Sequence, residues 1–96
     1  MQFAIICEDK PNSVELRQST RPEHVDYLNG LGKTLVFAGP FLDESGNPCG
    51  SLVVIEAADQ AEAEAIAGRD PYGHAGLFES VTVRPFRLAF NTTTST

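Results

Sequence analysis

The chain has 96 residues, which is enough for one domain with a single modest hydrophobic core. Its 7 basic and 13 acidic side chains give a formal net charge of −6, which argues against a nucleic-acid or anionic-membrane partner. No segment is apolar enough to span a bilayer, and the opening MQFAIICEDK lacks the basic start of a signal peptide. We therefore expect a soluble, cytoplasmic protein, whose two cysteines are too few for a disulfide framework.

The first half of the chain predicts a strand, a helix and a second strand. QFAIIC (2–7) is apolar and is followed by loop residues, as is typical of a strand. Two helix starts come next: Ser13 can cap a short first turn, and Thr20 with Glu23 has capping-box spacing around a first-turn proline. Glycines end this helix, and TLVFAGPF (34–41) predicts the second strand.

The second half predicts a strand, a helix and a last strand. SLVVIEA (51–57) follows the turn DESGNP and returns alongside the strand before it. Asp59 and Glu62 repeat the capping-box spacing and begin a second helix. The residues expected on its buried side are apolar: Ala61, Ala65 and Ile66. SVTVRPFRLAF (80–90) predicts the last strand.

The predicted order β-α-β-β-α-β is the ferredoxin-like arrangement, an α+β two-layer sandwich with antiparallel sheet order 4-1-3-2. Pro40 and Pro85 lie in the predicted second and fourth strands, and proline is tolerated mainly in edge strands. These two strands are the edges of that sheet order. We expect one domain over residues 1–90, followed by a flexible tail at 91–96, where NTTTST is polar and patternless.

The predicted strands are apolar on both faces, although a two-layer sandwich covers only one face of its sheet. In the third strand, Leu52 and Val54 alternate with Val53 and Ile55. A bare apolar face indicates a partner, and a second copy of the chain is the simplest one. We therefore predict a homodimer whose sheets meet face to face.

Asp70 stands out because the proline after it holds its backbone away from the helical conformation. It either caps a short helix that begins at Pro71 or points toward a partner elsewhere in the chain. The βαββαβ path brings three positions to one end of the sheet: Asp9 after the first strand, His24 in the first turn of its helix, and Asp70. We therefore expect His24 and Asp70 to lie on one rim.

A carboxylate beside a histidine fixes the tautomer of the imidazole and leaves its second nitrogen free as a general base. This favours His24 as the catalytic proton-transfer residue and Asp70 as its orienting acid. Two alternatives stay open at this point. Asp9 can take the place of Asp70, and a histidine in the first turn of a helix is often a solvated surface residue.

Four polar residues near the same rim are predicted to bind a substrate: Arg17, Arg21, Ser51 and Asp9. Two arginines that converge there can hold an anionic group by bidentate hydrogen bonds. Ion pairing with neighbouring acids is an equally simple role for them. Ser51 offers a hydroxyl, and the glycine before it allows either a close backbone approach or a bulge.

We expect neither a metal nor a cofactor. Cys7 and Cys49 lie near the predicted rim, but no CxxC or HxxxH spacing accompanies them, and no glycine-rich phosphate loop is present. Cys7 is expected in the core and His74 at the surface.

Several short motifs, taken in order, resemble the YCII-related (YciI-like) family over residues 1–90. They are the EDKPNS loop, R-x-x-x-R-P-x-H (17–24), AGP (38–40), GS (50–51), DPY (70–72), AGLFESV (75–81) and V-x-P-F (83–86). The resemblance implies a ferredoxin-like fold and a dimer of the dimeric α+β barrel type. It also implies that the histidine and aspartate suspected of catalysis in that family are His24 and Asp70 here.

One similar protein is a chlorohydroxyquinol dehydrochlorinase, and the wider superfamily includes muconolactone isomerase and cofactor-free oxygenases. The resemblance thus implies a small cofactor-free lyase or isomerase that acts on an anionic cyclic or aromatic metabolite. The alternative is a non-catalytic dimer that binds a small molecule at the same rim. The turn at 42–50 is shorter than in typical members, which bears on the roof of the pocket and the size of the substrate.

Overall fold

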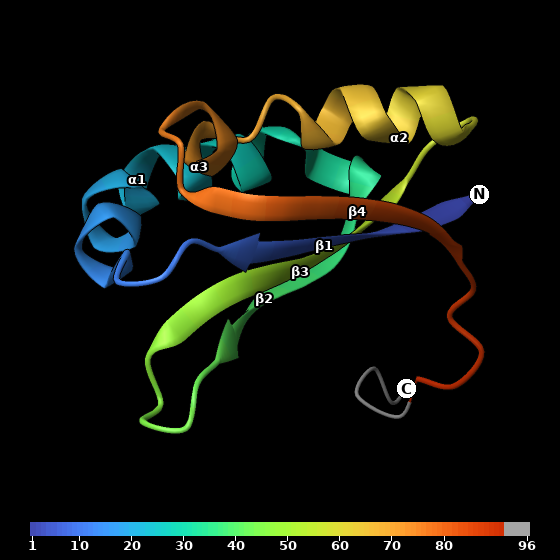
Figure 1. Ribbon diagram of the computed structural model, residues 1–96. Coiled ribbons are helices and arrows are strands. Elements are labelled where there is room, and N and C mark those ends of the chain that lie inside the picture. The colour runs from blue at the N-terminus through green and yellow to red at the C-terminus, as the bar shows by residue number, and fades with distance from the viewer. Residues whose placement is uncertain (92–96) are drawn as a thin grey trace.

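Four antiparallel strands form one sheet, and three helices cover one of its faces (Figure 1). The computed structural model describes residues 1–91. Its strands are β1 (Gln2–Asp9), β2 (Leu35–Leu42), β3 (Pro48–Glu56) and β4 (Phe78–Phe86). Its helices are α1 (Val14–Gly30), α2 (Gln60–Ala67) and α3 (Pro71–His74), with a 3₁₀ turn at Gly32–Thr34. The tail predicted at 91–96 lies outside the described residues except for Asn91.

The strand order is β2-β3-β1-β4, and each neighbouring pair is antiparallel. Read from β4, this is the predicted order 4-1-3-2, so the ferredoxin-like α+β fold of the dimeric α+β barrel proteins is confirmed. Pro40 and Pro85 lie in the two edge strands, where one side of the backbone has no partner strand to bond. Within residues 1–91, no helix is long and apolar enough to cross a membrane.

The first helix is continuous, so the prediction of two separate starts is wrong. Pro22 lies inside α1, and the Ser13 side chain makes no capping hydrogen bond. A proline inside a helix removes one backbone hydrogen bond, but buried side chains on both sides of it, Arg17 and His24, hold the helix against the rest of the molecule. His24 therefore lies in the middle of α1 and not in a first turn.

The second helix begins as predicted. The Asp59 side chain accepts a hydrogen bond from the Glu62 N–H, and the Glu62 side chain accepts one from the Ala58 N–H. Its buried side differs in part from the prediction. Ile66 is buried, but Ala61 and Ala65 are exposed, and Ala63 is buried in their place. Residues three apart share a helix face, so the stripe that packs on the sheet runs through Ala63 and Ile66.

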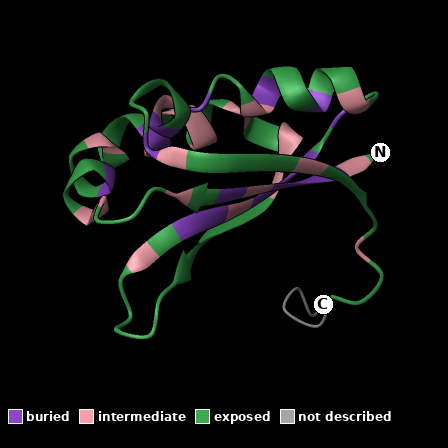
Figure 2. Ribbon diagram, viewed as in Figure 1, coloured by how far each residue is buried: buried purple, intermediate pink, exposed green. Residues whose placement is uncertain are grey.

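The hydrophobic core lies between the sheet and the helices. β1 and β3 form its centre because each has a strand on both sides, and Figure 2 shows buried residues along their middle. Side chains from β1, β3 and α2 make up the core cluster: Phe3, Ile5, Cys7, Val53, Ile55, Ala57, Ala63 and Ile66.

The other face of the sheet has no helix over it (Figure 1). The strand register places Phe37 opposite Val54 and Phe41 opposite Gly50, so both phenylalanines project from this face. Each is 39% exposed, and Phe86 packs edge-on against Phe37 at 6.4 Å between ring centroids. We call this apolar surface the open face.

Candidate active site

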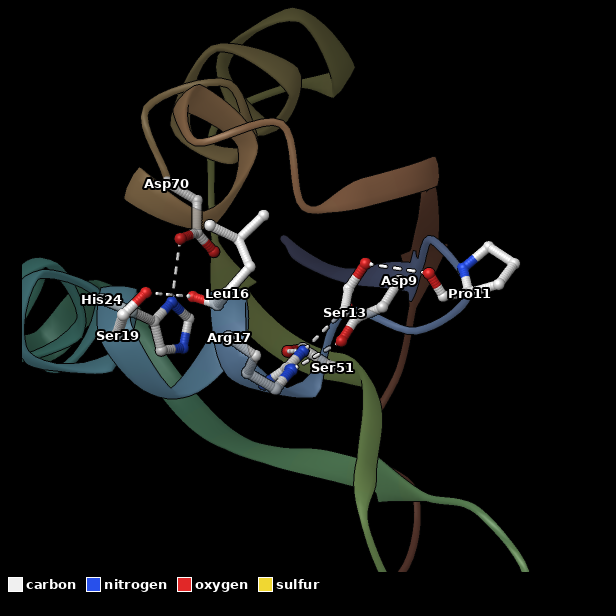
Figure 3. A network of polar contacts seen from close by, with 9 residues as sticks. All are labelled: Asp9, Pro11, Ser13, Leu16, Arg17, Ser19, His24, Ser51 and Asp70. Atoms are coloured by element: carbon white, nitrogen blue, oxygen red, sulfur yellow. Dashed lines mark hydrogen bonds and ion pairs between the residues drawn. The ribbon is translucent and has the colours of Figure 1, made fainter.

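His24 and Asp70 meet although they lie 46 positions apart in the chain. Nδ1 of His24 lies 2.8 Å from Oδ1 of Asp70 (Figure 3). His24 is 8% exposed and Asp70 is 4% exposed. A carboxylate only accepts hydrogen bonds, so in the neutral imidazole Nδ1 carries the proton and Nε2 is left as an acceptor.

Asp70 also caps α3. The backbone N–H of Tyr72 donates to the same Oδ1 at 2.9 Å, and Pro71 occupies the first helical position. Asp70 itself is extended, with φ −65° and ψ 125°, as the following proline requires. The sequence allowed Asp70 either to cap α3 or to contact a distant partner. One oxygen atom, Oδ1, does both.

Asp9 contacts Arg17 and not His24. Arg17 Nε donates to Asp9 Oδ2 at 2.7 Å and Nη2 donates to Oδ1 at 3.1 Å, in a two-pronged pair (Figure 3). The two side chains are 6% and 5% exposed. Asp70 is thus the acid beside His24, and the alternative with Asp9 in that place does not match the structure.

Ser51 completes this second cluster. Its hydroxyl accepts a hydrogen bond from Arg17 Nη2 at 2.8 Å, which joins α1 to β3. Burial would lower the pKa of the Arg17 guanidinium, but Asp9 together with Tyr72 outweighs burial and raises that pKa above its ordinary value. Arg17 is therefore held rigidly at the inner side of α1 with its charge balanced by Asp9.

A cleft of about 250 Å³ separates α1 from β2 and β3. Six polar residues line it: Arg17, Gln18, Arg21, His24, Ser51 and Tyr72. The rest of the lining is mostly apolar: Val25, Leu28, Ala38, Gly39, Pro40, Pro48 and Val53. Arg21 is exposed and makes no hydrogen bond or ion pair with any residue in the described part of the chain. An apolar cleft with a few convergent polar groups is the usual form of a small-molecule site.

Tyr72 is a site residue that the sequence interpretation missed. Its ring stacks on the His24 imidazole, with centroids 4.0 Å apart, and the Arg17 guanidinium carbon lies 4.5 Å from the ring centroid. The sequence did contain a signal for it. Tyr72 is two residues after Asp70, and a capping side chain accepts a hydrogen bond from the backbone N–H at about that position, so Tyr72 was bound to lie close to Asp70.

The remaining sequence candidates lie away from this cleft. Cys7 is buried in β1, where burial above all, with the charge of Asp70, raises the pKa of its thiol to about 12. Cys49 and His74 are exposed. Among the residues that the structure describes, no group of three or more His, Cys, Asp or Glu side chains is placed to hold a metal ion.

Known proteins share both the fold and part of the sequence of this chain. The model of the YCII-related domain matches residues 1–87. The chain belongs to the YCII-related family. Protein YciI of Escherichia coli O6:H1 is 38% identical over 98 residues, which cover 94% of this chain and 100% of that protein. A Haemophilus influenzae relative is 33% identical with the same coverage.

A solved structure of this type carries a ligand. It is 5-chloro-2-hydroxyhydroquinone dehydrochlorinase (TftG) from Burkholderia phenoliruptrix AC1100, in complex with 2,5-dihydroxybenzoquinone. It superposes on this YCII-related chain with a TM-score of 0.82 at 28% identity and covers 91% of this chain and 94% of its own. A Bacteroides thetaiotaomicron protein named as a putative antibiotic biosynthesis monooxygenase shares the fold, with a TM-score of 0.59 at 10% identity, and covers 100% of this chain and 95% of its own.

Proposed function

We propose that this protein is a small cofactor-free lyase or isomerase that acts on an anionic cyclic or aromatic metabolite. The observation that carries the proposal is the buried His24–Asp70 pair at the wall of a mostly apolar cleft. The similarity to TftG, which is named a dehydrochlorinase of a hydroxylated aromatic ring, supports the reaction type. Acid–base catalysis by side chains needs no cofactor.

In this proposal, His24 moves the proton. Asp70 holds the proton on Nδ1, so Nε2 accepts a proton from the substrate, and the carboxylate stabilises the imidazolium that forms. In an elimination, the leaving group departs with the electron pair of its bond, and the ring gains one unsaturation. In an isomerisation, the imidazolium returns the proton to a different atom of the ring.

Arg17 and Ser51 bind the oxygen on which negative charge develops. Arg17 contributes guanidinium N–H groups that Asp9 leaves free, and Asp9 keeps the guanidinium in place. Ser51 accepts from Arg17, so its own proton is available to the substrate. Arg21 also lines the cleft, makes no hydrogen bond or ion pair among residues 1–91, and attracts an anionic substituent of the ring.

The test is chloride release from 5-chloro-2-hydroxyhydroquinone under anaerobic conditions, which suppress spontaneous oxidation of the ring. The chain has two histidines, which provide a matched control. We expect His24→Ala to lower the rate at least about 100-fold, the lower range for a general acid–base group. We expect His74→Ala, an exposed residue outside the cleft, to keep the wild-type rate. Equal rates in all three proteins would overturn the role of His24.

The alternative function is a non-catalytic binding protein with the same cleft. The observation that favours it is the polar and apolar lining, which recognises a small anionic ring without any chemical step. Binding of 2,5-dihydroxybenzoquinone without chloride release from the chlorinated ring would support this alternative over the enzyme.

We also propose that two copies associate through the open face and that the dimer works in the cytoplasm. Phe37, Phe41 and Phe86 leave an apolar surface that a second sheet would cover. Sedimentation equilibrium at micromolar concentration tests this. We expect a dimer for the wild type and a monomer for Phe37→Glu, because a charge at that site cannot be buried without a partner. A wild-type monomer would contradict the proposal.

A further inference from the structure

Tyr72 lies at the centre of the candidate site, and neither its ring nor its hydroxyl has a role in the function proposed so far. It is the second residue of α3 and is 1% exposed, yet it lines the cleft. A buried tyrosine almost always satisfies its hydroxyl. The partner of that hydroxyl therefore decides what the residue does.

The ring of Tyr72 is fixed on several sides. His24 stacks on it at 4.0 Å with an interplanar angle of 18°, and the Arg17 guanidinium carbon lies 4.5 Å from its centroid. Arg17 and His24 are about two turns apart on α1, so the ring fills the space between them. Phe78 packs edge-on at 6.0 Å, and the Tyr72 N–H is bound to Asp70. The hydroxyl thus has one fixed position.

The partners of the two tyrosine hydroxyls in the chain differ. The Tyr27 hydroxyl donates to the Ile66 carbonyl oxygen at 2.5 Å. The Tyr72 ring instead faces the guanidinium of Arg17, whose carbon lies 4.5 Å from the ring centroid, and a guanidinium has no acceptor for the phenol proton. Among residues 1–91, no carbonyl or carboxylate oxygen accepts that proton. The O–H is therefore available to a molecule in the cleft.

Tyr72 keeps this proton at neutral pH. Burial raises the pKa of its phenol, and the charges of Arg17 and Arg21 offset only part of that effect. A neutral phenol in a site of low dielectric is a strong donor to an oxygen that carries negative charge.

We propose that the Tyr72 hydroxyl binds the ligand directly, as a third hydrogen-bond donor beside Arg17 and Ser51 to the anionic oxygen of a planar, acidic ring. The proposal rests on the proposed function for the location of the site, but it concerns binding and holds whether or not a chemical step follows. Tyr72 then links the His24–Asp70 pair to the cluster of Asp9, Arg17 and Ser51, because its ring also stacks on the His24 imidazole.

The test uses 2,5-dihydroxybenzoquinone as the probe and the two tyrosines as a matched pair. Tyr72→Phe keeps the stacked ring and removes only the hydroxyl, and Tyr27→Phe removes a hydroxyl outside the cleft. We expect the dissociation constant, measured by absorbance titration, to rise about tenfold to hundredfold in Tyr72→Phe, the range for a hydrogen bond to a charged group. We expect no change in Tyr27→Phe.

A second measurement needs no substitution at Tyr72. Protein labelled with 3-fluorotyrosine gives two fluorine NMR signals, and Tyr27→Phe assigns them. The probe is expected to shift the Tyr72 signal and leave the Tyr27 signal in place. The proposal fails if Tyr72→Phe binds like the wild type, if both variants weaken equally, if neither signal moves, or if the wild type does not bind the probe.

These outcomes are separate from those of the proposed function. Chloride release that requires His24 but is unaffected by Tyr72→Phe would keep the enzyme and remove this role of Tyr72. Probe affinity that depends on Tyr72, without any chloride release, would keep this role and favour the binding protein.

Discussion

Asp9 and Asp70 are both buried carboxylates beside the cleft, and each is committed to its own partner. Asp70 gives one oxygen to the His24 imidazole and to the backbone of α3. Asp9 gives both oxygens to the Arg17 guanidinium. The orientation of the imidazole and the start of a helix therefore depend on one atom, whereas the charge of Arg17 is balanced by a residue that does not contact the imidazole.

The His24–Asp70 pair predicts non-additive kinetics. Asp70→Asn keeps the size of the side chain and an oxygen that can cap α3, but it removes the charge that orients the imidazole. We expect chloride release from 5-chloro-2-hydroxyhydroquinone to fall at least about 100-fold in Asp70→Asn. The double variant is expected to be no slower than His24→Ala alone, because the two residues act as one unit. Rate losses that multiply would show that they act separately.

The Arg17–Asp9 pair predicts a large loss of stability when one partner is removed. Asp9→Ala leaves the guanidinium buried without a counter-charge, which costs about 3–5 kcal/mol in comparable pairs. The control is Glu56→Ala, which removes an exposed pair with the N-terminus, where about 0–1 kcal/mol is expected. Urea unfolding of both variants measures the difference. If Asp9→Ala and Glu56→Ala had similar free energies of unfolding, the cost of leaving the Arg17 charge buried without a partner would be contradicted.

Among the helices and strands, α1 carries most of the site. Arg17, Arg21 and His24 recur every three to four residues and so share one face of the helix, which looks onto the cleft. Pro22 lies on this helix without ending it, and the contacts of α1 with α3 compensate for the missing hydrogen bond. Helix continuity here comes from packing and not from local propensity.

This explains which parts of the molecule the sequence could predict. The alternation of strands and helices and the edge positions of Pro40 and Pro85 are local patterns, and they were enough for the fold. The topology predicted that His24 and Asp70 would lie on one rim, and they do meet, but it wrongly placed His24 in the first turn of its helix. The sequence could not predict that Asp9 is the partner of Arg17, because several acidic residues are near Arg17 in the sequence. Only the packing of α1 against the end of β1 determines which of them Arg17 contacts.

The close approach of β1 and β3 predicts sensitivity at one glycine. A methyl group at Gly50 would collide with the Cys7 carbonyl oxygen, which is backbone and cannot move alone. We expect Gly50→Ala to lower the free energy of unfolding by about 1–3 kcal/mol, as overpacking does. Gly39→Ala in the edge strand β2 is the control, since nothing lies within 4 Å of the added methyl. Denaturation midpoints decide; equal stability of the two variants would contradict the close approach.

In the folded molecule, three acidic groups hold protons that the unfolded chain would release more easily, namely the Cys7 thiol and the phenols of Tyr27 and Tyr72. Burial above all raises the pKa of the Cys7 thiol to about 12 and that of the Tyr27 phenol to about 12. The folded state therefore binds more protons than the unfolded state once the pH exceeds about 9, and stability must fall as the pH rises further.

These raised pKa values predict that the protein loses stability at alkaline pH, and the contribution of Cys7 can be measured by substitution. The free energy of unfolding is expected to be constant from neutral pH to about 9 and to decrease between there and about 12. Cys7→Ala removes one of these three groups and is expected to make the decrease shallower. Cys49→Ala removes an exposed thiol and is expected to leave the slope unchanged. Guanidinium unfolding at a series of pH values measures the slopes, and identical slopes would refute the role of Cys7.

The long sequence separation of the contacts in the site has a kinetic consequence. His24 and Asp70 are 46 positions apart, and Arg17 and Ser51 are 34 apart, so the cleft exists only after α1, β3 and α3 have docked. Contacts between distant segments form late, and interactions that are absent from the transition state act on the unfolding rate alone. A bound small molecule should therefore prolong the lifetime of the folded protein while the speed of folding stays the same.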